Sequence, residues 1–238
     1  MAVVNASRGW QGAVLKLLRA GDYELTVTGA RRISANYLQL SFAGGGFLVD
    51  REPHPTMWIR MWFPDGERVH QRGYTVVNPD RETDRFDVEF ALHDGIASRW
   101  AEKARAGDTI AATALGSNFS LPEPAPTGYV IVGDTASLPA VNSLLEAIGE
   151  IPAKVFLEAG RDGDRDLPVV CGADVAWIDR VNSGEALVQA VREGSFHAPD
   201  HFGWVACDNR TTRAVAKVLR DEYGISRRAI KAQAYWVA

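Results

Sequence analysis

The sequence has little cysteine, little histidine and no long hydrophobic run. Its 238 residues include five histidines and two cysteines, Cys171 and Cys207, which lie far apart and form no CxxC pair. This excludes a zinc site or an iron–sulfur cluster built on paired cysteines, so both thiols are expected to be reduced core residues. No apolar run approaches the ~20 residues of a membrane span, and the N-terminus lacks the apolar block of a secretion signal. The cytoplasm is therefore the default compartment.

Excess positive charge is also absent. The formal net charge is −4, which argues against a nucleic-acid-binding protein. Hydrophobic residues make up 46% of the chain and charged residues 24%, values that are typical of a soluble globular protein. The length is comfortable for two modest domains.

The first half of the chain predicts β-structure. Six short segments rich in β-branched and aromatic residues are bounded by turn residues, and together they favour a small antiparallel barrel. They are ELTVTGA, YLQLSFAG, MWIRMWFPDG, YTVVNPD, FDVEFALHDG and TIAATALG. One helix, IASRWAEKARAG, is expected to end with Gly107 as its C-cap residue.

The second half predicts a parallel α/β sheet. The proline-rich segment LPEPAPTG, residues 121–128, is typical of a linker. After it, apolar strands (YVIVG, KVFLEAG, VAWI, GWVAC, IKAQAYW) alternate with helical stretches (SLPAVNSLLEAIG, GEALVQAVREG, TTRAVAKVLRDEYG). This alternation is typical of a doubly wound sheet. We therefore expect a β-barrel domain at 1–122, with an N-terminal extension at 1–22, and an α/β domain at 128–238.

The extension contains an amphipathic stretch, RGWQGAVLKLLRAGD. Trp10, Val14, Leu17 and Leu18 recur at helical spacing. The stretch is expected to pack against the barrel, and contact with an acidic membrane surface is the alternative.

The stretch QRGYT places a cation, a phenol ring and a hydroxyl within four residues. Arg72 at a strand entrance offers a planar fork that fits phosphate oxygens. Tyr74 shares its face of the strand, and Thr75 offers a hydroxyl beside it. A flavin dinucleotide requires these groups together, although a salt-bridged arginine and an ordinary strand tyrosine are the simpler interpretation of this stretch alone.

Two further stretches could face an anion. In HDGIASRWAEKA, the small residues at Gly95, Ile96, Ala97 and Ser98 let the amides at a helix N-terminus approach a diphosphate, or Ser98 is an ordinary N-cap. In YVIVGDTASLPA, a buried strand ends at Gly133 before a loop with Asp134, Thr135 and Ser137, and ligands of open α/β sheets bind at that edge. The single glycine and the acidic Asp134 make it a weak nucleotide fingerprint.

Taken in order, these stretches resemble the siderophore-interacting protein family, a branch of the ferredoxin–NADP reductase-like flavoproteins. The family motifs are matched by Arg72-Gly73-Tyr74-Thr75, by FDVEFALHDGIASRWA, by GDTASLPA (133–140) and by Tyr235-Trp236. RGWQGAVLK, GYVIVGDTASLPAVN and KAQAYW resemble one subgroup, the siderophore-interaction domain at the N-terminus of the mycobacterial ABC importer of mycobactins. The resemblance implies a ferredoxin–NADP reductase-like fold, with FAD in the barrel and NAD(P)H in the α/β domain.

The implied activity is reduction of a ferric siderophore of the mycobactin or carboxymycobactin kind, with release of Fe(II). Nicotinamide gives two electrons at once and ferric iron accepts one, so a flavin must stand between them. The hard oxygen ligands of a siderophore hold Fe(II) less tightly than Fe(III). No residue of the chain is expected to act as acid or base, and no protein metal site is expected.

The resemblance also implies a set of binding residues. Arg72, Gly73, Tyr74 and Thr75 would contact the flavin, with Gly95, Ile96, Ala97 and Ser98 on its diphosphate and His93 adjacent. Gly133, Asp134, Thr135 and Ala136 would face the nicotinamide nucleotide, and Tyr235 or Trp236 would stack near the flavin. The chain departs from the family at Val77, where many members have arginine, and at Cys207-Asp208, where many have Gly-Glu.

The coenzyme is left open between NADH and NADPH. Glu158 would bond the ribose hydroxyls of NAD, whereas Arg161 and Arg165 would receive a 2′-phosphate. The siderophore is left open as well: Trp58, Arg60 and Trp62 share one strand face, which barrel packing explains unless the tryptophans are exposed.

Two other functions remain as alternatives. One is a reductase that passes electrons to a ferredoxin-like protein, which would require a basic docking surface. The other is a flavin- or siderophore-binding module without coenzyme affinity. A monomer is expected, with peripheral contact to the inner face of the cell membrane or to a siderophore transporter as a further expectation.

Overall fold

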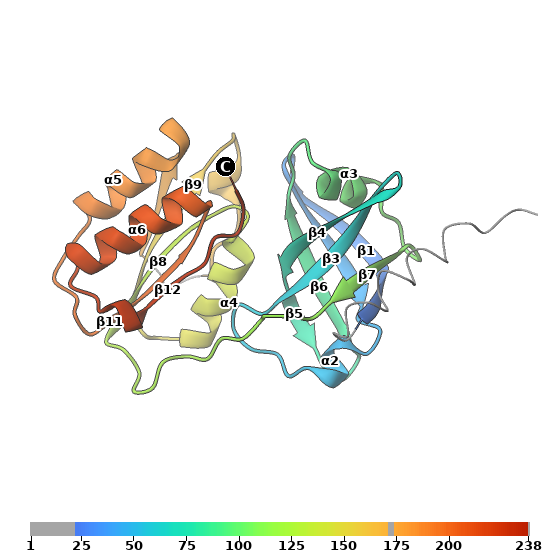
Figure 1. Ribbon diagram of the computed structural model, residues 1–238, viewed down its shortest axis with the longest axis horizontal. Helices are drawn as coiled ribbons and strands as arrows, with labels where there is room; N and C mark the ends of the chain where they lie inside the picture. Colours follow the sequence, from blue (N-terminus) through green and yellow to red (C-terminus); the bar gives the residue numbers. More distant parts are fainter. Residues whose placement is uncertain (1–21, 171–173, 238) are drawn as a thin grey trace, which may run out of the picture.

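The computed structural model describes residues 22–170 and 174–237. The amphipathic stretch with Trp10 and the cysteine Cys171 lie outside these residues. The described chain forms an antiparallel sheet of seven strands followed by a parallel sheet of five strands. Figure 1 shows these as two bodies side by side, which we call the barrel half and the α/β half.

The barrel half is an antiparallel half-barrel. Its strand order is β4-β3-β7-β1-β2-β6-β5. The strands are β1 (Asp22–Ser34), β2 (Tyr37–Ala43), β3 (Trp58–Asp65), β4 (Arg68–Thr75), β5 (Val77–Asp80), β6 (Arg85–Ala91) and β7 (Thr109–Thr113). Two helices, α2 (Phe47–Asp50) and α3 (Ile96–Lys103), interrupt them. Apolar residues alternate along the strands, so that Ile59, Met61 and Phe63 of β3 are fully buried inside.

Two details of the barrel half correct the sequence expectations. The structure has seven strands where the sequence predicts six, because one predicted strand is two strands: β4 runs from Arg68 to Thr75, and β5 begins after Val76. The early part of β4 was missed because RVHQRG is polar on both faces. Helix α3 ends at Lys103 with Ala104 as its C-cap, so Gly107 is not the cap. Gly107, with φ of 93°, instead makes the turn that leads into β7.

The α/β half is a doubly wound sheet with strand order β10-β9-β8-β11-β12. Its strands are β8 (Gly128–Asp134), β9 (Ala153–Ala159), β10 (Asp174–Asp179), β11 (His201–Ala206) and β12 (Ile230–Ala232). Helices α4 (Leu138–Ile148), α5 (Glu185–Glu193) and α6 (Asn209–Asp221) cover it. All four pairings are parallel, and the order reverses between β8 and β11. Ligands of such sheets bind at the carboxyl ends of the strands near this reversal.

The two faces of the parallel sheet have separate cores. Helix α4 packs on the face toward the barrel half, whereas α5 and α6 cover the far face (Figure 1). The α4 core includes Tyr37 of β2, which is fully buried together with Tyr129 and Ile131 of β8. The halves therefore share apolar packing along the α4 face. None of the described helices is long and apolar enough to cross a membrane.

Replacing Phe42 by alanine tests the barrel core. Phe42 is fully buried and stacks on Phe86 with ring centroids 5.9 Å apart. The cavity left by its ring should lower the free energy of unfolding by about 3–5 kcal/mol. Urea unfolding followed by circular dichroism measures the change. The control is Val49→Ala, because Val49 is 62% exposed; an equal loss in both variants would contradict this core assignment.

Candidate functional site

The stretch from Arg72 to Thr75 forms the last part of β4. Tyr74 lies opposite Ile59 and Arg72 opposite Met61 in the antiparallel pairing with β3. Since side chains alternate along a strand, Arg72 and Tyr74 point toward the inside of the half-barrel and Thr75 points the other way. Arg72 is thus well inside a strand and not at a strand entrance, because β4 begins four residues earlier than expected.

Tyr74 is packed between aromatic rings, whereas Arg72 reaches solvent. The Tyr74 ring lies 4.5 Å from Phe90 and 5.7 Å from Phe63, centroid to centroid. Burial raises the pKa of Tyr74, so its hydroxyl stays protonated. Arg72 is exposed, and its Nη1 donates to the Gln71 carbonyl at 2.8 Å. Its guanidinium forms no ion pair with any carboxylate in the described parts of the chain.

Helix α3 packs against β3, the strand that pairs with β4. Trp100 of α3 makes an edge contact with Phe63, 5.6 Å between centroids, and Phe63 also contacts Tyr74. Gly95 is the N-cap, and a Cβ there would lie 2.3 Å from Cε1 of the exposed His93 side chain, which would have to move aside. The amides of the first helical turn have no partner within the helix and form its positive end.

Ser98 and His93 complete this corner. The Ser98 Oγ accepts a hydrogen bond from the His93 amide at 3.1 Å, which ties the helix to the end of β6. Burial of part of the ring and the nearby charges of Arg161 and Arg72 lower the pKa of His93. His93 is therefore neutral at pH 7, and it stands between one arginine of each half of the molecule. Ile96 is half-buried and Ala97 is buried against the barrel core.

The loop after β8 is held by hydrogen bonds between its own residues. The Ser137 amide donates to Asp134 Oδ1 at 3.0 Å, and the Asp134 amide donates to Ser137 Oγ at 2.9 Å. A Cβ on Gly133 would lie 2.6 Å from Ser137 Oγ, so this turn requires glycine. Thr135 is half-buried and its carbonyl accepts from the Tyr37 hydroxyl at 3.1 Å, whereas Ala136 is exposed. Asp134 itself is buried and faces the interior.

The C-terminal segment returns along β11 to the boundary between the halves. The Tyr235 amide donates to the Cys207 carbonyl at 2.9 Å, and Trp236 forms a parallel bridge with Asp208. Burial raises the pKa of Tyr235, and an interaction with the Thr75 hydroxyl opposes that rise. Tyr235 thus lies against Thr75 of the other half. The Thr75 Oγ1 is buried and has no hydrogen-bond partner of good geometry among the described residues.

Three buried carboxylates gather at the carboxyl edge of the parallel sheet. Asp134, Glu158 and Asp208 follow or end β8, β9 and β11. Arg180 bonds Glu158 Oε2 and lies 3.7 Å from Asp208 Oδ2. The Trp236 ring covers the group: its Nε1 donates to Asp134 Oδ2 at 2.7 Å, and the Arg180 guanidinium lies 4.9 Å from its centroid. The group is a compact, largely internal network of ions and hydrogen bonds.

The carboxyl pKa values of this group are shifted in different directions. Burial raises the pKa of Asp134, although hydrogen bonds from Trp236 and Ser137 oppose this rise. It also raises the pKa of Glu158, against the charge of Arg180. Asp208 is the N-cap of α6, and hydrogen bonds from Thr211 and Arg210 outweigh its burial and lower its pKa.

The structure brings most of the expected residues into two neighbouring groups. Residues 72–75 and the segment with His93 and residues 95–98 belong to the barrel half, where the charge of Arg72 acts on His93. Tyr235 of the α/β half lies by Thr75. Asp134 and Trp236 belong to the carboxylate group instead. Asp208 is the buried N-cap of α6, and Val77 is half-buried at the start of β5. Trp58, Arg60 and Trp62 are half-buried on the outer face of β3, and Trp62 donates to Thr113 Oγ1 at 2.9 Å.

Sequence reasoning missed two residues that join these groups. Arg180 holds the carboxylates together, and its position just after a β-strand, at the ligand edge of the sheet, was the available signal. Tyr37 links β2 to the loop after β8, and no local pattern marks a contact between segments so far apart. Arg161, one of the two arginines offered as an alternative receiver of a 2′-phosphate, donates to the Leu92 carbonyl of the barrel half.

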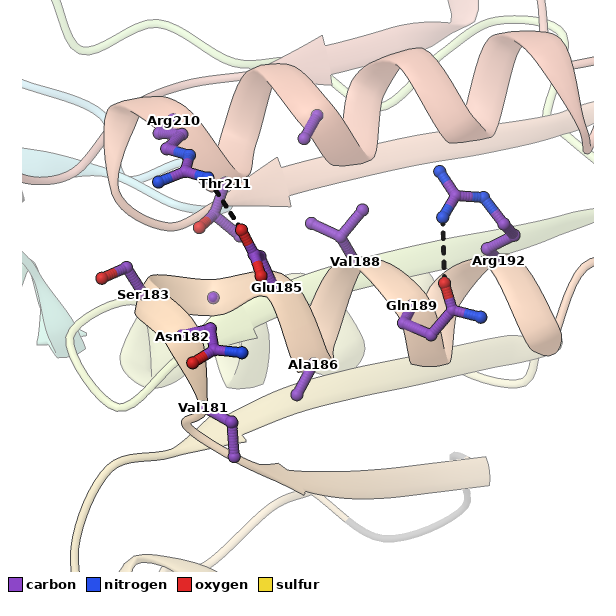
Figure 2. Close-up of a pocket in the computed structure, with 12 residues that line it drawn as sticks. Val181, Asn182, Ser183, Glu185, Ala186, Val188, Gln189, Arg192, Arg210 and Thr211 are labelled. Carbon is purple, nitrogen blue, oxygen red and sulfur yellow. Dashed lines mark hydrogen bonds and ion pairs between the residues drawn. The ribbon is translucent and has the colours of Figure 1, made fainter.

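A separate cavity lies along α5 and beside the first part of α6. Figure 2 shows its lining, with Arg210 paired to Glu185 at 3.0 Å and Arg192 bonded to Gln189. Its volume is about 510 Å³. The cavity is on the face of the sheet turned away from the barrel half (Figure 1), and no residue expected at the site lines it.

Comparison with known proteins gives the family. The profile described as Siderophore-interacting protein matches residues 126–238, and the one described as Siderophore-interacting FAD-binding domain matches residues 26–117. The chain belongs to the siderophore-interacting protein family. The family assignment makes the barrel half an FAD-binding domain by descent.

Two relatives illustrate the range of the family. The mycobactin import ATP-binding/permease protein of Mycolicibacterium smegmatis is 34% identical over 97% of this chain and 27% of its own length. This chain thus spans about a quarter of the importers that it matches. The ferric vibriobactin reductase of Vibrio cholerae is 26% identical over 86% of this chain and 85% of its own length.

Solved structures share the fold. The siderophore-interacting protein SipS of Aeromonas hydrophila superposes with a TM-score of 0.78 at 22% identity, covering 92% of both chains. A ferredoxin–NADP⁺ reductase from Neisseria gonorrhoeae superposes with a TM-score of 0.66 at 15% identity, covering 91% of this chain and all of the other. The ferredoxin–NADP reductase-like fold expected from the sequence is confirmed.

The barrel-half residues are chemically suited to a flavin dinucleotide. Arg72 and the amides at the start of α3 supply positive charge for a diphosphate. The buried Thr75 hydroxyl has hydrogen-bonding capacity that the described residues do not use. The lack of a side chain at Gly95 leaves the His93 ring close to the helix. Arg72 and the Thr75 hydroxyl thus lie near the C-terminal end of β4 on opposite sides of the strand, and the first-turn amides lie at the start of α3.

Arg72→Gln tests the diphosphate role of this cation. Losing charge-assisted hydrogen bonds should raise the Kd for FAD by about tenfold to a hundredfold. Fluorescence titration of the FAD-free protein with FAD measures this Kd. Arg68→Gln is the matched control, because Arg68 is exposed at the opposite end of the same strand. Equal Kd values for the two variants would contradict a role for Arg72.

Asp208→Ala tests the N-cap of α6. The lowered pKa of Asp208 means that its ionised form stabilises the fold, so the loss should be about 1–2 kcal/mol in unfolding free energy at pH 7. The stabilisation is lost as the pH falls through the folded-state pKa, below the ordinary value of 3.8. The difference between variant and parent should therefore shrink in acid. Urea unfolding across pH measures this, with the exposed Asp162→Ala as control.

Proposed function

We propose that this chain is an FAD-dependent reductase of ferric siderophores that uses a nicotinamide dinucleotide as electron donor. The observation that carries the proposal is the contact of Tyr235 with Thr75. It brings the C-terminal segment of the α/β half against the motif strand of the FAD-binding half. Electrons can pass only over short distances, and this is the place where a coenzyme bound at the sheet edge would meet a flavin.

Each group of residues has a task in this proposal. Arg72 and the first-turn amides at residues 95–98 hold the diphosphate of FAD, with His93 beside them as a neutral neighbour. Tyr74 offers the face of a ring that Phe63 and Phe90 already fix. Thr75 offers its hydroxyl to the polar edge of the isoalloxazine. Bound FAD supplies the redox chemistry, since it accepts a hydride and gives up electrons singly.

The α/β half has the task of positioning the coenzyme. Gly133, Thr135 and Ala136 lie at the carboxyl edge beside the strand reversal, where nucleotides bind in such sheets. Tyr235 separates that edge from Thr75 and excludes water from the boundary while no coenzyme is bound. A nicotinamide ring that reaches the flavin must displace Tyr235 or slide beside it.

The substrate class is supported by the relatives. One is a mycobactin importer and the other a ferric vibriobactin reductase. Reduction releases the metal because Fe(II) is less charged and softer than Fe(III), so the hard oxygen donors of a siderophore hold it less tightly. The described residues include no group of three or more His, Cys, Asp or Glu side chains arranged to hold a metal ion. In this proposal the siderophore brings the iron, which is the substrate.

One observation favours a second function, that of a binding module. Trp236 and Arg180 cover the carboxylates at the sheet edge, and Asp134 is turned inward. If this edge never opens, the chain binds flavin or siderophore and does not accept hydride from a coenzyme.

Anaerobic mixing separates the two functions. The FAD-loaded protein is mixed with NADH or with NADPH, and the absorbance of oxidised flavin is followed by stopped flow. The reductase should lose this absorbance with at least one coenzyme and regain it when ferric carboxymycobactin is added. An Fe(II) chelator should then report about two iron ions per nicotinamide oxidised, from electron balance. Unchanged absorbance with both coenzymes would favour the binding module.

A further inference from the structure

Glu158 lies where sheets of this topology bind the ribose of the coenzyme. It is next to last in β9, beside Asp134 of β8 and Ile178 of β10. A carboxylate at the end of the second strand bonds the ribose 2′-hydroxyl of NAD in nucleotide-binding sheets, whereas an arginine nearby receives the 2′-phosphate of NADP. Which coenzyme suits this chain therefore depends on the surroundings of Glu158 and on the freedom of the arginines.

One oxygen of Glu158 still has hydrogen-bonding capacity. Glu158 is 3% exposed, and its Oε2 bonds Arg180. Its Oε1 is buried and has no hydrogen-bond partner among the described residues. A buried acceptor without a donor is unfavourable, and a ribose hydroxyl is a donor of the right kind. Phosphate oxygens at neutral pH are acceptors and cannot fill this role.

The two arginines on the exposed side of this edge are engaged elsewhere. Arg161 donates to the Leu92 carbonyl and lies 3.5 Å from Asn36 Oδ1, both in the barrel half. Arg165 donates to Asp179 Oδ1 at 2.7 Å and to the Trp177 carbonyl at 3.1 Å. Moving Arg161 would break a contact between the halves, and moving Arg165 would break its ion pair with β10.

Arg180 is held still more firmly. It lies between two buried carboxylates, Glu158 and Asp208, and is stacked on Trp236. If Arg180 turned to a phosphate, it would leave buried carboxylates without their cation, which is strongly unfavourable. With Asp134 included, the group holds three carboxylates and one guanidinium, so a phosphate placed there would meet net negative charge.

We propose that Glu158 makes this chain select NADH over NADPH, by accepting the ribose 2′-hydroxyl and repelling a 2′-phosphate. This rests on the proposed function, since it presumes a coenzyme at the sheet edge. The hydroxyl would donate to the buried Glu158 Oε1, which has no other donor, while Arg180 stays bonded to Oε2. Arg180 keeps its second carboxylate, Asp208, throughout.

Fragments of the coenzymes test the selection without any redox step. The FAD-loaded protein is titrated by calorimetry with ADP-ribose and with 2′-phospho-ADP-ribose, which differ only in the phosphate. ADP-ribose should bind at least about tenfold more tightly, as expected for one repelled phosphate beside a carboxylate. Glu158→Gln keeps the shape and removes the charge, so the ratio of the two Kd values should fall by about tenfold.

Two further variants guard against misfolding as the cause. Glu158→Asp keeps the charge and should keep the preference for ADP-ribose. Glu150→Gln is the matched control at the opposite edge of the sheet, where Glu150 is exposed, and should leave both Kd values unchanged. FAD content and circular dichroism of each variant verify that it is folded.

The outcomes separate this inference from the proposed function. The selection of NADH over NADPH would be overturned if the parent protein bound the phosphorylated fragment equally or more tightly. It would also be overturned if neither fragment bound. An unchanged ratio in Glu158→Gln would overturn the role of Glu158. If ADP-ribose is preferred but neither NADH nor NADPH reduces the flavin, the selection stands and the reductase function fails. If NADPH reduces the flavin faster than NADH, the selection fails and the reductase function stands.

Discussion

Carboxylates buried at the carboxyl edge of the parallel sheet need hydrogen-bond donors, and this need organises the molecule. Asp134 takes its donor from the ring of Trp236, which fixes the C-terminal segment beside β11. The preceding Tyr235 then packs its ring against Trp204 of β11, near the boundary with the barrel half. There it meets Thr75. A polar requirement inside one half thus determines which side chain faces β4 of the other half.

The two groups of site residues differ in how many of their polar side chains already have hydrogen-bond or ion-pair partners within the protein. In the barrel half, Arg72 has no ion-pair partner and Thr75 Oγ1 no hydrogen-bond partner among the described residues. A ligand there can pair with the Arg72 guanidinium without breaking an ion pair among the described residues, which suits a tightly held cofactor. At the sheet edge, Asp134, Asp208 and Arg180 already bond one another or Trp236. A ligand there must exchange partners, which suits a coenzyme that binds and leaves in every cycle.

Much of the fold could be predicted because its strands carry strong local signals. Tyr129–Val132 is a continuous apolar run and is fully buried, as a central parallel strand requires. β4 gave no such signal: its first residues are polar on both faces, and only pairing with β3 makes them a strand. The prediction that Gly107 is a C-cap was wrong for a related reason. A glycine after a helical stretch marks either a C-cap or a later turn, and only the hydrogen bond from Gly107 to β1 in the folded chain distinguishes the two.

The candidate site was predictable where its residues are neighbours in sequence and not where they meet through the fold. Spacing alone puts Arg72 and Tyr74 on one face of a strand. Nothing in the sequence indicates that Arg180 would neutralise Glu158, or that Arg161 would reach the Leu92 carbonyl, because these contacts join segments that only the folded chain brings together. Tertiary structure therefore gives each of these cations a partner that residue types alone do not indicate.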